Sequence, residues 1–399
     1  MLYENLGNTN DASVDLFPSE NEEPITRIKV VGIGGAGCNA VNRMIQDGLG
    51  NVEFVAVNTD LQVLKNSVAK VKMQIGARST KGLGAGAKPE IGEKAAQEDI
   101  EEIRALFSKT DMIFITAGMG GGTGTGAAPI FAKVAKEMGV LTVAVVTLPF
   151  DFEGRQRIER AMMGIDKLKE NVDTMIVISN SRIFKVIERK AHIRNAFHKI
   201  DEVLKHAVQG ISSIITDVGI INVDFADVRT VLSNKGEAIM GVGIGSGESR
   251  AIDAAKLALE NPLIENSSFK NAAAILVNIV GGSDFSMSEY YEAAQTITEF
   301  CRPDAEIIVG VNVDDKLQDK VKIILIATGF QKEDQMAELE QSPLSIDNAI
   351  EDRKVLSISE IRRERMKNRT NFEQNFVNKA FLEEDYETPT FYRRQNRMG

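Results

Sequence analysis

The sequence has 399 residues, of which 43% are hydrophobic and 26% are charged, so it is long enough for two globular domains with tails. A formal net charge of -10 argues against nucleic-acid binding through bulk charge, and two cysteines give no disulfide framework, which favours a reducing compartment. Three histidines and two cysteines are too few for a typical zinc site, no apolar run reaches the ~20 residues that span a bilayer, and no secretory signal is recognisable.

Alternating strands and helices are predicted for the first half of the chain. Residues 1–25 hold six acidic residues and no Lys or Arg, which predicts a disordered acidic tail. Strands are predicted over residues 27–33, 52–57, 71–75, 111–117, 140–147 and 175–179, helices over residues 38–46, 90–107, 127–138 and 154–171, and a loop over residues 76–89. This alternation predicts a Rossmann-like, parallel, doubly wound α/β domain over residues 26–190.

A long helix is predicted next, over residues 192–216. Its apolar residues recur at steps of three and four: Phe197, Ile200, Leu204, Val208, Ile211 and Ile215. Residues 191–222 are assigned to this central helix and the loop after it, as a connector to a second α/β domain over residues 223–330. The segments of that domain are residues 223–232, 237–242 and 272–280, the helices 249–259 and 286–300, and the strands 306–313 and 321–328.

Beyond residue 330 the composition becomes polar. Residues 331–384 are interpreted as a flexible linker, although Phe372, Phe376, Val377 and Phe381 leave open a helix that orders on a partner. Residues 385–399 combine aromatic and charged side chains and are interpreted as a partner-docking peptide, with an inert terminus as the alternative.

The segment 118–126 has six glycines among nine residues, between a predicted strand and a predicted helix. Glycine allows a ligand close to the main chain, and N–H groups at a helix start converge on an anion. The segment therefore predicts a polyphosphate site, to which Thr123 and Thr125 add hydroxyl donors. A close-packed turn is the alternative. Pro129 is expected in the first turn of the helix that follows.

A second glycine pattern, Gly32-x-Gly34-x-x-Gly37, fits the dinucleotide fingerprint, with Asp60 as the expected acid. On this pattern alone, an NAD-dependent oxidoreductase remains an alternative. The richer segment 118–126, a third glycine segment at residues 82–86 and the absence of a hydride-transfer constellation argue against it. The sequence also lacks the P-loop motif.

Taken together, the motifs resemble the tubulin/FtsZ family over residues 27 to about 330 and in the terminal peptide. The resemblance rests on residues 80–87, 118–129, 149–154 and 222–229. It implies a site for GTP/GDP formed by Gly34, Gly35, Ala36, Asn39, Asn58, Asp60, Ala85, Gly86, Gly118, Gly120, Gly121, Gly122, Thr123, Gly124, Thr125, Glu153, Arg157, Asn180, Phe197 and Asp201.

In this site, the resemblance assigns the phosphates to the glycine segments and the ribose side to Glu153 and Arg157. Asn180, Phe197 and Asp201 would read guanine, Phe197 by stacking and Asp201 by accepting from the N1–H and N2–H donors. Phe197 and Asp201 lie four residues apart and so share a helix face. Without the resemblance, a core phenylalanine and a solvated aspartate would be the default interpretation.

The resemblance also implies the catalytic residues Asn222, Asp224 and Asp227, with Mg2+ as a further cofactor. At 1.5 Å per residue, the long helix separates them by ~30 Å from the phosphates, out of reach of their own subunit's nucleotide. They would instead act on the next subunit of a head-to-tail filament, where the two carboxylates position the attacking water. Asp224 and Asp227 also suit the first turn of a helix, which is compatible with catalysis.

We therefore expect a cytoplasmic GTPase, active only when assembled, that forms the division ring at mid-cell. Its expected partners are further copies of itself and, through residues 385–394, membrane tethers and regulators. Neither a direct membrane span nor sequence-specific nucleic-acid binding is expected. The alternatives are the NAD-dependent oxidoreductase and a polymer-forming relative without turnover.

Overall fold

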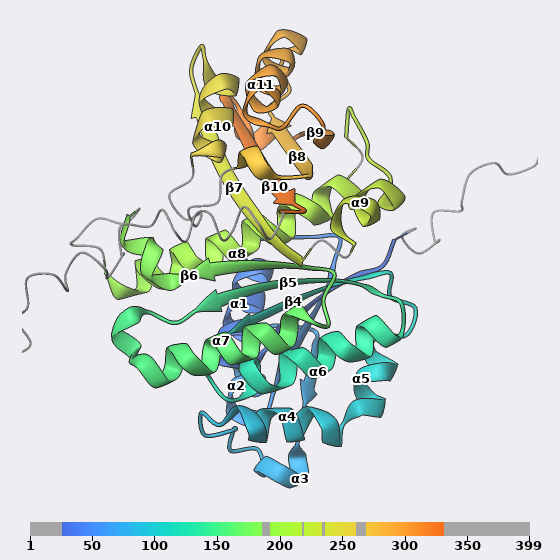
Figure 1. The fold of residues 1–399 in the computed structure, drawn as a ribbon, viewed down its shortest axis with the longest axis vertical. Helices are drawn as coiled ribbons and strands as arrows, with labels where there is room; N and C mark the ends of the chain where they lie inside the picture. Colours follow the sequence, from blue (N-terminus) through green and yellow to red (C-terminus); the bar gives the residue numbers. More distant parts are fainter. Residues whose placement is uncertain (1–25, 186–191, 218, 234–235, 261–268, 331–399) are drawn as a thin grey trace, which may run out of the picture. The chain divides into compact units, whose positions relative to one another are not determined.

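A computed structural model describes residues 26–185, 192–217, 219–233, 236–260 and 269–330 (Figure 1). In this part of the chain, ten strands pair in the order β3-β2-β1-β4-β5-β6-β7-β10-β8-β9. They are β1 Ile28–Ile33, β2 Glu53–Asn58, β3 Val71–Gln74, β4 Met112–Gly118, β5 Leu141–Leu148, β6 Thr174–Ser179, β7 Gly236–Ser246, β8 Ala274–Gly281, β9 Glu306–Val313 and β10 Lys320–Thr328. The predictions for residues 1–25, 331–384 and 385–399 lie outside the described residues.

Strands β1 to β6 are all parallel, as the sequence predicts. The central strand β4 is buried at its first six residues, because helices cover both faces of this part of the sheet. Since the strands run in one direction, their carboxyl ends meet at one edge of the sheet, which we call the carboxyl edge. The opposite edge, where β1 to β6 begin, is the amino edge.

Two sets of helices cover the two faces of the parallel strands. The helices are α1 Gly34–Gln46, α2 Leu61–Asn66, α3 Ala77–Thr80, α4 Pro89–Glu98, α5 Ile100–Leu106, α6 Thr123–Glu137, α7 Arg155–Lys169, α8 Ile193–Thr216, α9 Phe225–Leu232, α10 Arg250–Leu259 and α11 Met287–Phe300. Helices α1, α2, α8 and α9 share one hydrophobic cluster with the strands. Helices α4 to α7 share another.

Several predicted boundaries are wrong, each for a local reason. The helix predicted over residues 90–107 is interrupted at Asp99, whose carboxylate accepts a hydrogen bond from the Gly76 amide at 2.6 Å. Helices α1 and α6 each begin four residues earlier than predicted, because their first turns consist largely of glycine and carry no hydrophobic pattern. Pro129 consequently lies beyond the first turn of α6, and the predicted loop 76–89 contains the short helix α3.

The second part of the sheet, β7 to β10, is mixed. Strand β10 pairs antiparallel with both β7 and β8, whereas β8 and β9 are parallel. Helices α10 and α11 cover one face, and α8 and α9 pack on the other. Strand β7 runs from Gly236 to Ser246, longer than the predicted segment 237–242, and its start pairs with the start of β6 at Thr174.

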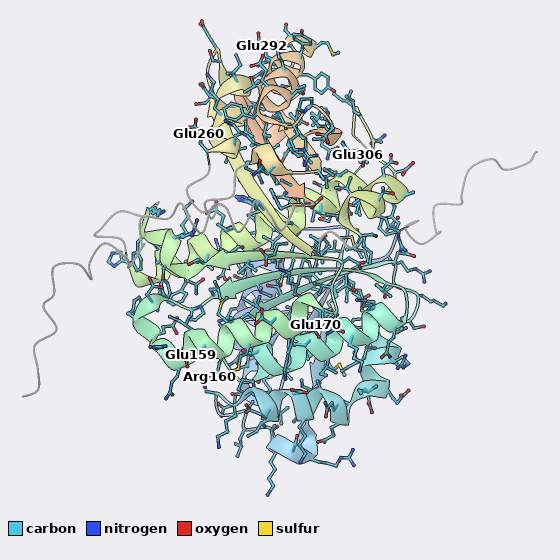
Figure 2. All side chains as sticks on the ribbon, in the orientation of Figure 1. Glu159, Arg160, Glu170, Glu260, Glu292 and Glu306 are labelled. Atoms are coloured by element: carbon cyan, nitrogen blue, oxygen red, sulfur yellow. The ribbon has the colours of Figure 1, made fainter. Side chains whose placement is uncertain are left out.

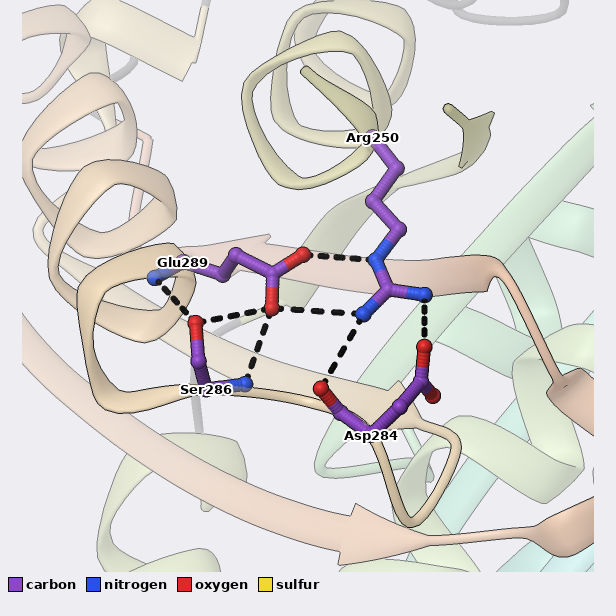
Figure 3. Close-up of polar contacts among 4 residues, drawn as sticks. All are labelled: Arg250, Asp284, Ser286 and Glu289. Atoms are coloured by element: carbon purple, nitrogen blue, oxygen red, sulfur yellow. Dashed lines mark hydrogen bonds and ion pairs between the residues drawn. The ribbon is translucent and has the colours of Figure 1, made fainter. Parts of the chain in front are cut away.

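Arg250 joins the amino ends of α10 and α11 (Figure 3). Its side chain is buried, and it donates to Glu289 at 2.6 Å and to Asp284 at 2.5 Å. Glu289 also accepts from the Ser286 amide at 2.8 Å, while the Ser286 hydroxyl caps α11. The bond from Arg250 holds the pKa of Glu289 at about 2. This cluster fixes the two helices to each other.

Helix α8 packs against both parts of the sheet. Four residues of the predicted apolar stripe, Ile200, Leu204, Val208 and Ile211, are buried as expected. Of the other two, Ile215 is half-buried and Phe197 is 49% exposed, so the default interpretation of Phe197 as a core phenylalanine is wrong. On the second part of the sheet, the Asn278 amide donates to the Ser213 hydroxyl at 2.6 Å. Helix α8 therefore connects the carboxyl edge of the parallel strands with strand β8.

Candidate functional site

The first glycine segment forms the junction between β1 and α1 at the carboxyl edge. Gly34 has a φ of +76°, and a Cβ at this position would lie 2.9 Å from the Gly124 amide nitrogen, so the first segment packs directly on the central one. Gly35, Ala36 and Asn39 are exposed in the first two turns of α1, and the space beside Gly35 is open. The N–H groups of this first turn have no partner within the helix and face outward.

The central segment makes a closed turn between β4 and α6. The Gly120 amide donates to the Thr125 hydroxyl at 2.8 Å, and the Met119 amide donates to the Thr147 carbonyl at 2.9 Å. A Cβ at Gly124 would lie 2.9 Å from the Gly118 carbonyl oxygen, whereas Gly121 has no atom within 4 Å of this position. The turn is thus rigid, and it leaves open space at its tip.

The third glycine segment packs against the central one. A Cβ at Gly122 would lie 2.8 Å from the Ala85 side chain, and the Thr123 hydroxyl is 2.6 Å from that of Thr59. Arg160 projects from α7 (Figure 2). It donates a hydrogen bond to the Ala87 carbonyl beside the exposed Gly86. Three glycine segments and the amino ends of α1 and α6 therefore meet at the carboxyl edge. Converging N–H groups and two helix dipoles are the arrangement that binds a polyphosphate.

Asn58 and Asp60, which follow β2, hold the backbone of the site. Asn58 is buried, donates weakly to the Cys38 thiol at 3.9 Å and accepts from the Asp60 amide at 3.2 Å. Asp60 caps α2 by accepting from the Gln62 amide at 2.8 Å. The single side-chain oxygen of Asn58 and one carboxylate oxygen of Asp60 therefore already accept hydrogen bonds from backbone amides of this turn.

Glu153, Arg157 and Asn180 lie after β5 and β6 on the same edge. Glu153 accepts from the Phe150 amide at 2.9 Å and forms an ion pair with Arg157 at 2.5 Å. The side-chain oxygen of Asn180 is buried and has no hydrogen-bond partner within the described part of the chain. A buried acceptor without a partner is costly, so this oxygen is suited to a donor on a bound molecule.

Phe197 and Asp201 lie one turn apart near the start of α8. The exposed ring of Phe197 is held edge-on by the buried ring of Phe150, with 5.8 Å between the ring centroids. Burial raises the pKa of Asp201 to about 6, Arg43 opposes this rise, and Asp47 adds to it. The pair offers an aromatic face and a carboxylate side by side, which suits a planar base with two donors.

Asn222, Asp224 and Asp227 lie at the opposite edge. The segment that carries them connects α8 to β7, which begins beside the first residue of β6. Asp217, at the end of α8, accepts from the Asn51 amide at 2.7 Å, just before β2 begins. Helix α8 has 24 residues and so measures about 36 Å. The structure thus separates these three residues from the glycine segments of the same chain.

All three side chains are exposed. Asp224 caps α9 by accepting from the Asp227 amide at 2.9 Å, and Asn222 accepts from the Gly219 amide at 2.7 Å. The expected helix start is confirmed, because Asp224 caps α9 and Asp227 lies in its first turn. One oxygen of Asp224 and both of Asp227 remain available in the described hydrogen-bond network.

Comparison with known proteins identifies the family. The GTPase-domain model of the tubulin/FtsZ family matches residues 27–188, and the model of the FtsZ C-terminal domain matches residues 236–331. A solved structure described as an empty FtsZ dimer from M. jannaschii is 43% identical, with a TM-score of 0.73 over 78% of this chain and 89% of that one. The chain belongs to the FtsZ family.

Two further structures agree with this fold. Another FtsZ structure from M. jannaschii, a point mutant, is 44% identical with a TM-score of 0.73 and covers 77% of this chain and 92% of its own. CetZ2 from Haloferax volcanii, in a GTPγS-bound protofilament, is 22% identical with a TM-score of 0.65, covering 81% and 99%, and shares the fold.

As a member of the FtsZ family, the chain is a GTPase that binds GTP and GDP and forms cytoskeletal filaments. The NAD-dependent oxidoreductase alternative is not supported. A Cβ at Gly32 would lie 2.3 Å from the Gly37 carbonyl oxygen, so these two glycines allow close helix–strand packing, which does not by itself specify the ligand. Asp60, the expected ribose acid, caps α2 instead.

Three residues that contact the candidate site were not singled out from the sequence: Thr59, Phe150 and Arg160. Thr59 lies between two predicted site residues at the end of β2, and that position was its only signal. Phe150 and Arg160 act on Phe197 and Ala87, which are far from them in sequence. No helix of the described residues is long and apolar enough to cross a membrane.

Proposed function

We propose that this FtsZ-family GTPase hydrolyses GTP only between subunits of a head-to-tail filament. The glycine segments of one subunit would hold the nucleotide, and Asn222, Asp224 and Asp227 of the next would complete the active site. The observation that carries the proposal is the separation of these two groups at opposite edges of the parallel strands, with α8 between them. A chain that carries both halves of a site out of reach of each other needs a second copy.

Exposed apolar side chains beside each half support a contact between copies. Ile220, two residues before Asn222, is 67% exposed, and Leu83, in the third glycine segment, is 84% exposed. Two different faces that meet form a heterologous contact, which extends into an open filament when the rotation does not close.

In the proposed complex, the N–H groups of the first turns of α1 and α6 bind the β- and γ-phosphates. Phe197 stacks on guanine, Asp201 accepts from its N1–H and N2–H groups, and the unpartnered oxygen of Asn180 accepts from a further donor. Glu153 and Arg157 lie toward the ribose. Of these side chains, Phe197 and Arg157 are exposed, Asp201 and Glu153 are half-buried, and the oxygen of Asn180 is buried without a partner among the described residues.

Mg2+ is proposed as the further cofactor. Across residues 26–185, 192–217, 219–233, 236–260 and 269–330, no group of three or more His, Cys, Asp or Glu side chains could hold a metal ion by itself. Mg2+ is commonly bound by substrate phosphates and water with few protein ligands, so the chain fits it, with the Thr123 hydroxyl as a protein ligand. When bound, the ion supplies positive charge to the phosphate oxygens.

The neighbouring subunit's carboxylates perform the remaining step. Asp224 and Asp227 accept hydrogen bonds from a water molecule and orient its oxygen toward the γ-phosphorus. The bond between the β–γ bridging oxygen and the γ-phosphorus breaks as the new P–O bond forms, which gives GDP and phosphate, and the proton of the water passes to solvent. Positioning and charge stabilisation suffice for phosphoryl transfer.

The test is the variant Asp227→Ala, with Asp253→Ala as the matched control, since Asp253 is likewise an exposed aspartate in the first turn of a helix. We expect Asp227→Ala to bind GTP normally and to lose turnover by about 100-fold or more, with Asp253→Ala unchanged. In the wild type, GTPase rate per subunit should rise with protein concentration. Normal turnover by Asp227→Ala, or a rate per subunit independent of concentration, would contradict the proposal.

We further propose that the filament acts at the mid-cell division ring in the cytoplasm, and that residues 385–399 dock membrane tethers and regulators. The support is the aromatic and charged composition of that peptide. Removing residues 385–399 should leave GTP turnover intact while a fluorescent fusion loses its ring localisation. If the truncated protein still forms normal rings, the docking role is wrong.

A further inference from the structure

Helices α1 and α8 present matching rows of side chains to each other. Asn39 and Arg43 on α1 and its C-cap residue Asp47 recur every four residues, so they lie along one side of the helix. Phe197, Asp201 and Lys205 do the same on α8. The last members of the two rows are in direct contact: the Lys205 ammonium lies 3.0 Å from the Asp47 carboxylate, which also pairs with Arg43 at 3.1 Å. The rows therefore run side by side toward the nucleotide.

The row order places Arg43 and Asp201 one turn closer to the carboxyl edge than the Asp47–Lys205 pair. The charged groups that act on Asp201 from α1 are Arg43, which attracts its negative charge, and Asp47, which repels it. On its own helix, Lys205 follows one turn later, and its ammonium is bound to Asp47. Arg43 is thus the cation from the facing helix that favours ionised Asp201.

We propose that Arg43 is a positioning residue for guanine recognition: it keeps the Asp201 carboxylate ionised, so that both oxygens accept from the base, and it thereby sets the lower pH limit of nucleotide binding. This inference rests on the proposed role of Asp201 in reading guanine. A protonated carboxyl group presents an O–H toward the N–H donors of guanine and loses one acceptor. Nucleotide binding must therefore expel the proton from Asp201.

The direction of the effect follows from the burial of Asp201. Because burial raises its pKa to about 6, about half of the free protein carries the proton at pH 6, and almost none does at pH 8. If only the ionised form binds guanine, the Kd for GDP is about twofold higher at pH 6 than at pH 8 from this group alone. Removing a nearby positive charge enlarges the ratio, and removing a nearby negative charge reduces it.

The experiment measures Kd for GDP at pH 6 and pH 8 by calorimetry, with GDP chosen to avoid filament turnover. The variants are Arg43→Gln, Arg43→Lys and Asp47→Asn. We expect the pH 6 to pH 8 ratio of Kd to increase about threefold or more in Arg43→Gln, to stay near the wild-type value in Arg43→Lys, and to fall in Asp47→Asn. The ligand is the same throughout, so titration of its diphosphate cancels when the ratios are compared.

An increase of the Kd ratio in Arg43→Gln together with a decrease in Asp47→Asn distinguishes an electrostatic role from a structural one. General damage to the fold would instead raise Kd in both variants at both pH values. Equal ratios in Arg43→Gln and the wild type would overturn the inference, as would a shift of the same sign in Asp47→Asn. Failure of the wild type to bind GDP at pH 8 would instead contradict the proposed function. Thermal unfolding without nucleotide verifies that each variant is folded.

Discussion

Two glycine-rich segments, residues 118–126 and the strand β7, look similar in sequence but serve different purposes. A Cβ at Gly241, Gly243 or Gly245 of β7 would lie 1.9, 2.0 or 1.9 Å from a carbonyl oxygen of α10. In the segment 118–126, Gly126 is equally closed, at 2.0 Å from the Pro89 carbonyl oxygen, but Gly121 has no atom within 4 Å. In β7, the alternate glycines let helix α10 pack close to the strand. In the central segment, glycines in tight backbone contact fix the turn, while Gly121 faces open space.

The comparison suggests a physical criterion for a ligand-binding glycine. A glycine in contact with backbone on all sides is needed for packing, and any side chain there disturbs the fold. An open glycine inside a rigid turn has no packing reason to lack a side chain. The reason is then an approaching ligand, which Gly121 and Gly35 are positioned to receive.

The largest effect is expected for Gly243→Ala. The added methyl group would meet the Ala254 carbonyl oxygen at 2.0 Å and the Ala258 amide at 2.6 Å, so α10 must move away from β7. We expect a loss of about 3 kcal/mol or more in unfolding free energy, measured by chemical denaturation. The matched control is Gly121→Ala, which should unfold like the wild type. A stable Gly243→Ala protein would invalidate the distinction between the two segments.

Next in size is Arg250→Met, which tests whether the β7 region depends on side-chain bonds as well as on glycine contacts. The substitution leaves Glu289 and Asp284 without their shared partner, and we expect a loss of about 2 kcal/mol near neutral pH. The folded-state pKa of Glu289 is depressed, so its stabilisation is present above about pH 4.5 and is lost as the pH falls toward about 2.

The difference in unfolding free energy between Arg250→Met and the wild type should therefore become smaller at low pH, as measured by chemical denaturation at several pH values. Arg155→Met is the control, since Arg155 forms an exposed ion pair with Glu159 and should change stability little. A difference that persists unchanged at low pH would mean that Arg250 stabilises the helices by packing alone.

Much of this architecture can be predicted from the sequence because it depends on apolar side chains that recur with the period of a helix or a strand. The parallel strands and the buried stripe of α8 at Ile200, Leu204 and Val208 follow from such patterns. The starts of α1 and α6 do not, since glycine carries no pattern at Gly34 or Gly124. Those missed turns are the ones that form the candidate site.

Site residues that act through their own chemistry could also be proposed from the sequence, with the help of the family resemblance. Contacts between distant residues could not: the bond from Arg160 to Ala87 spans 73 positions, and the rows on α1 and α8 meet through Lys205 and Asp47, 158 positions apart. Such pairs cannot be predicted from local sequence, because only the folded structure brings the two residues together. The same holds for the open space beside Gly121.

A smaller effect is expected for Gly121→Ala on the binding side of the comparison. The substitution meets no protein atom, so any loss of affinity reports the space reserved for a ligand. We expect the Kd for GDP to rise by about tenfold, with the unfolding midpoint of the nucleotide-free protein unchanged. Gly50→Ala, at another open glycine away from the carboxyl edge, is the control for backbone effects. Unchanged GDP affinity in Gly121→Ala would remove this glycine from the site.

The smallest effect is expected for Arg160→Gln, which asks whether the third glycine segment needs a side-chain anchor in addition to its contact with Gly122. Ala87 adopts a φ of +58°, which is unfavourable for a residue other than glycine, and the bond from Arg160 to its carbonyl holds that conformation in place. Loss of one such hydrogen bond should free the segment more often and speed GDP release about threefold in a stopped-flow displacement assay. Arg155→Gln, on the same helix but 92% exposed and paired only with Glu159 in the described contacts, should release GDP at the wild-type rate. If both variants release GDP at the wild-type rate, the packing of Ala85 on Gly122 is sufficient to fix the third glycine segment. Contacts at glycine would then stabilise this side of the site, as they do in β7.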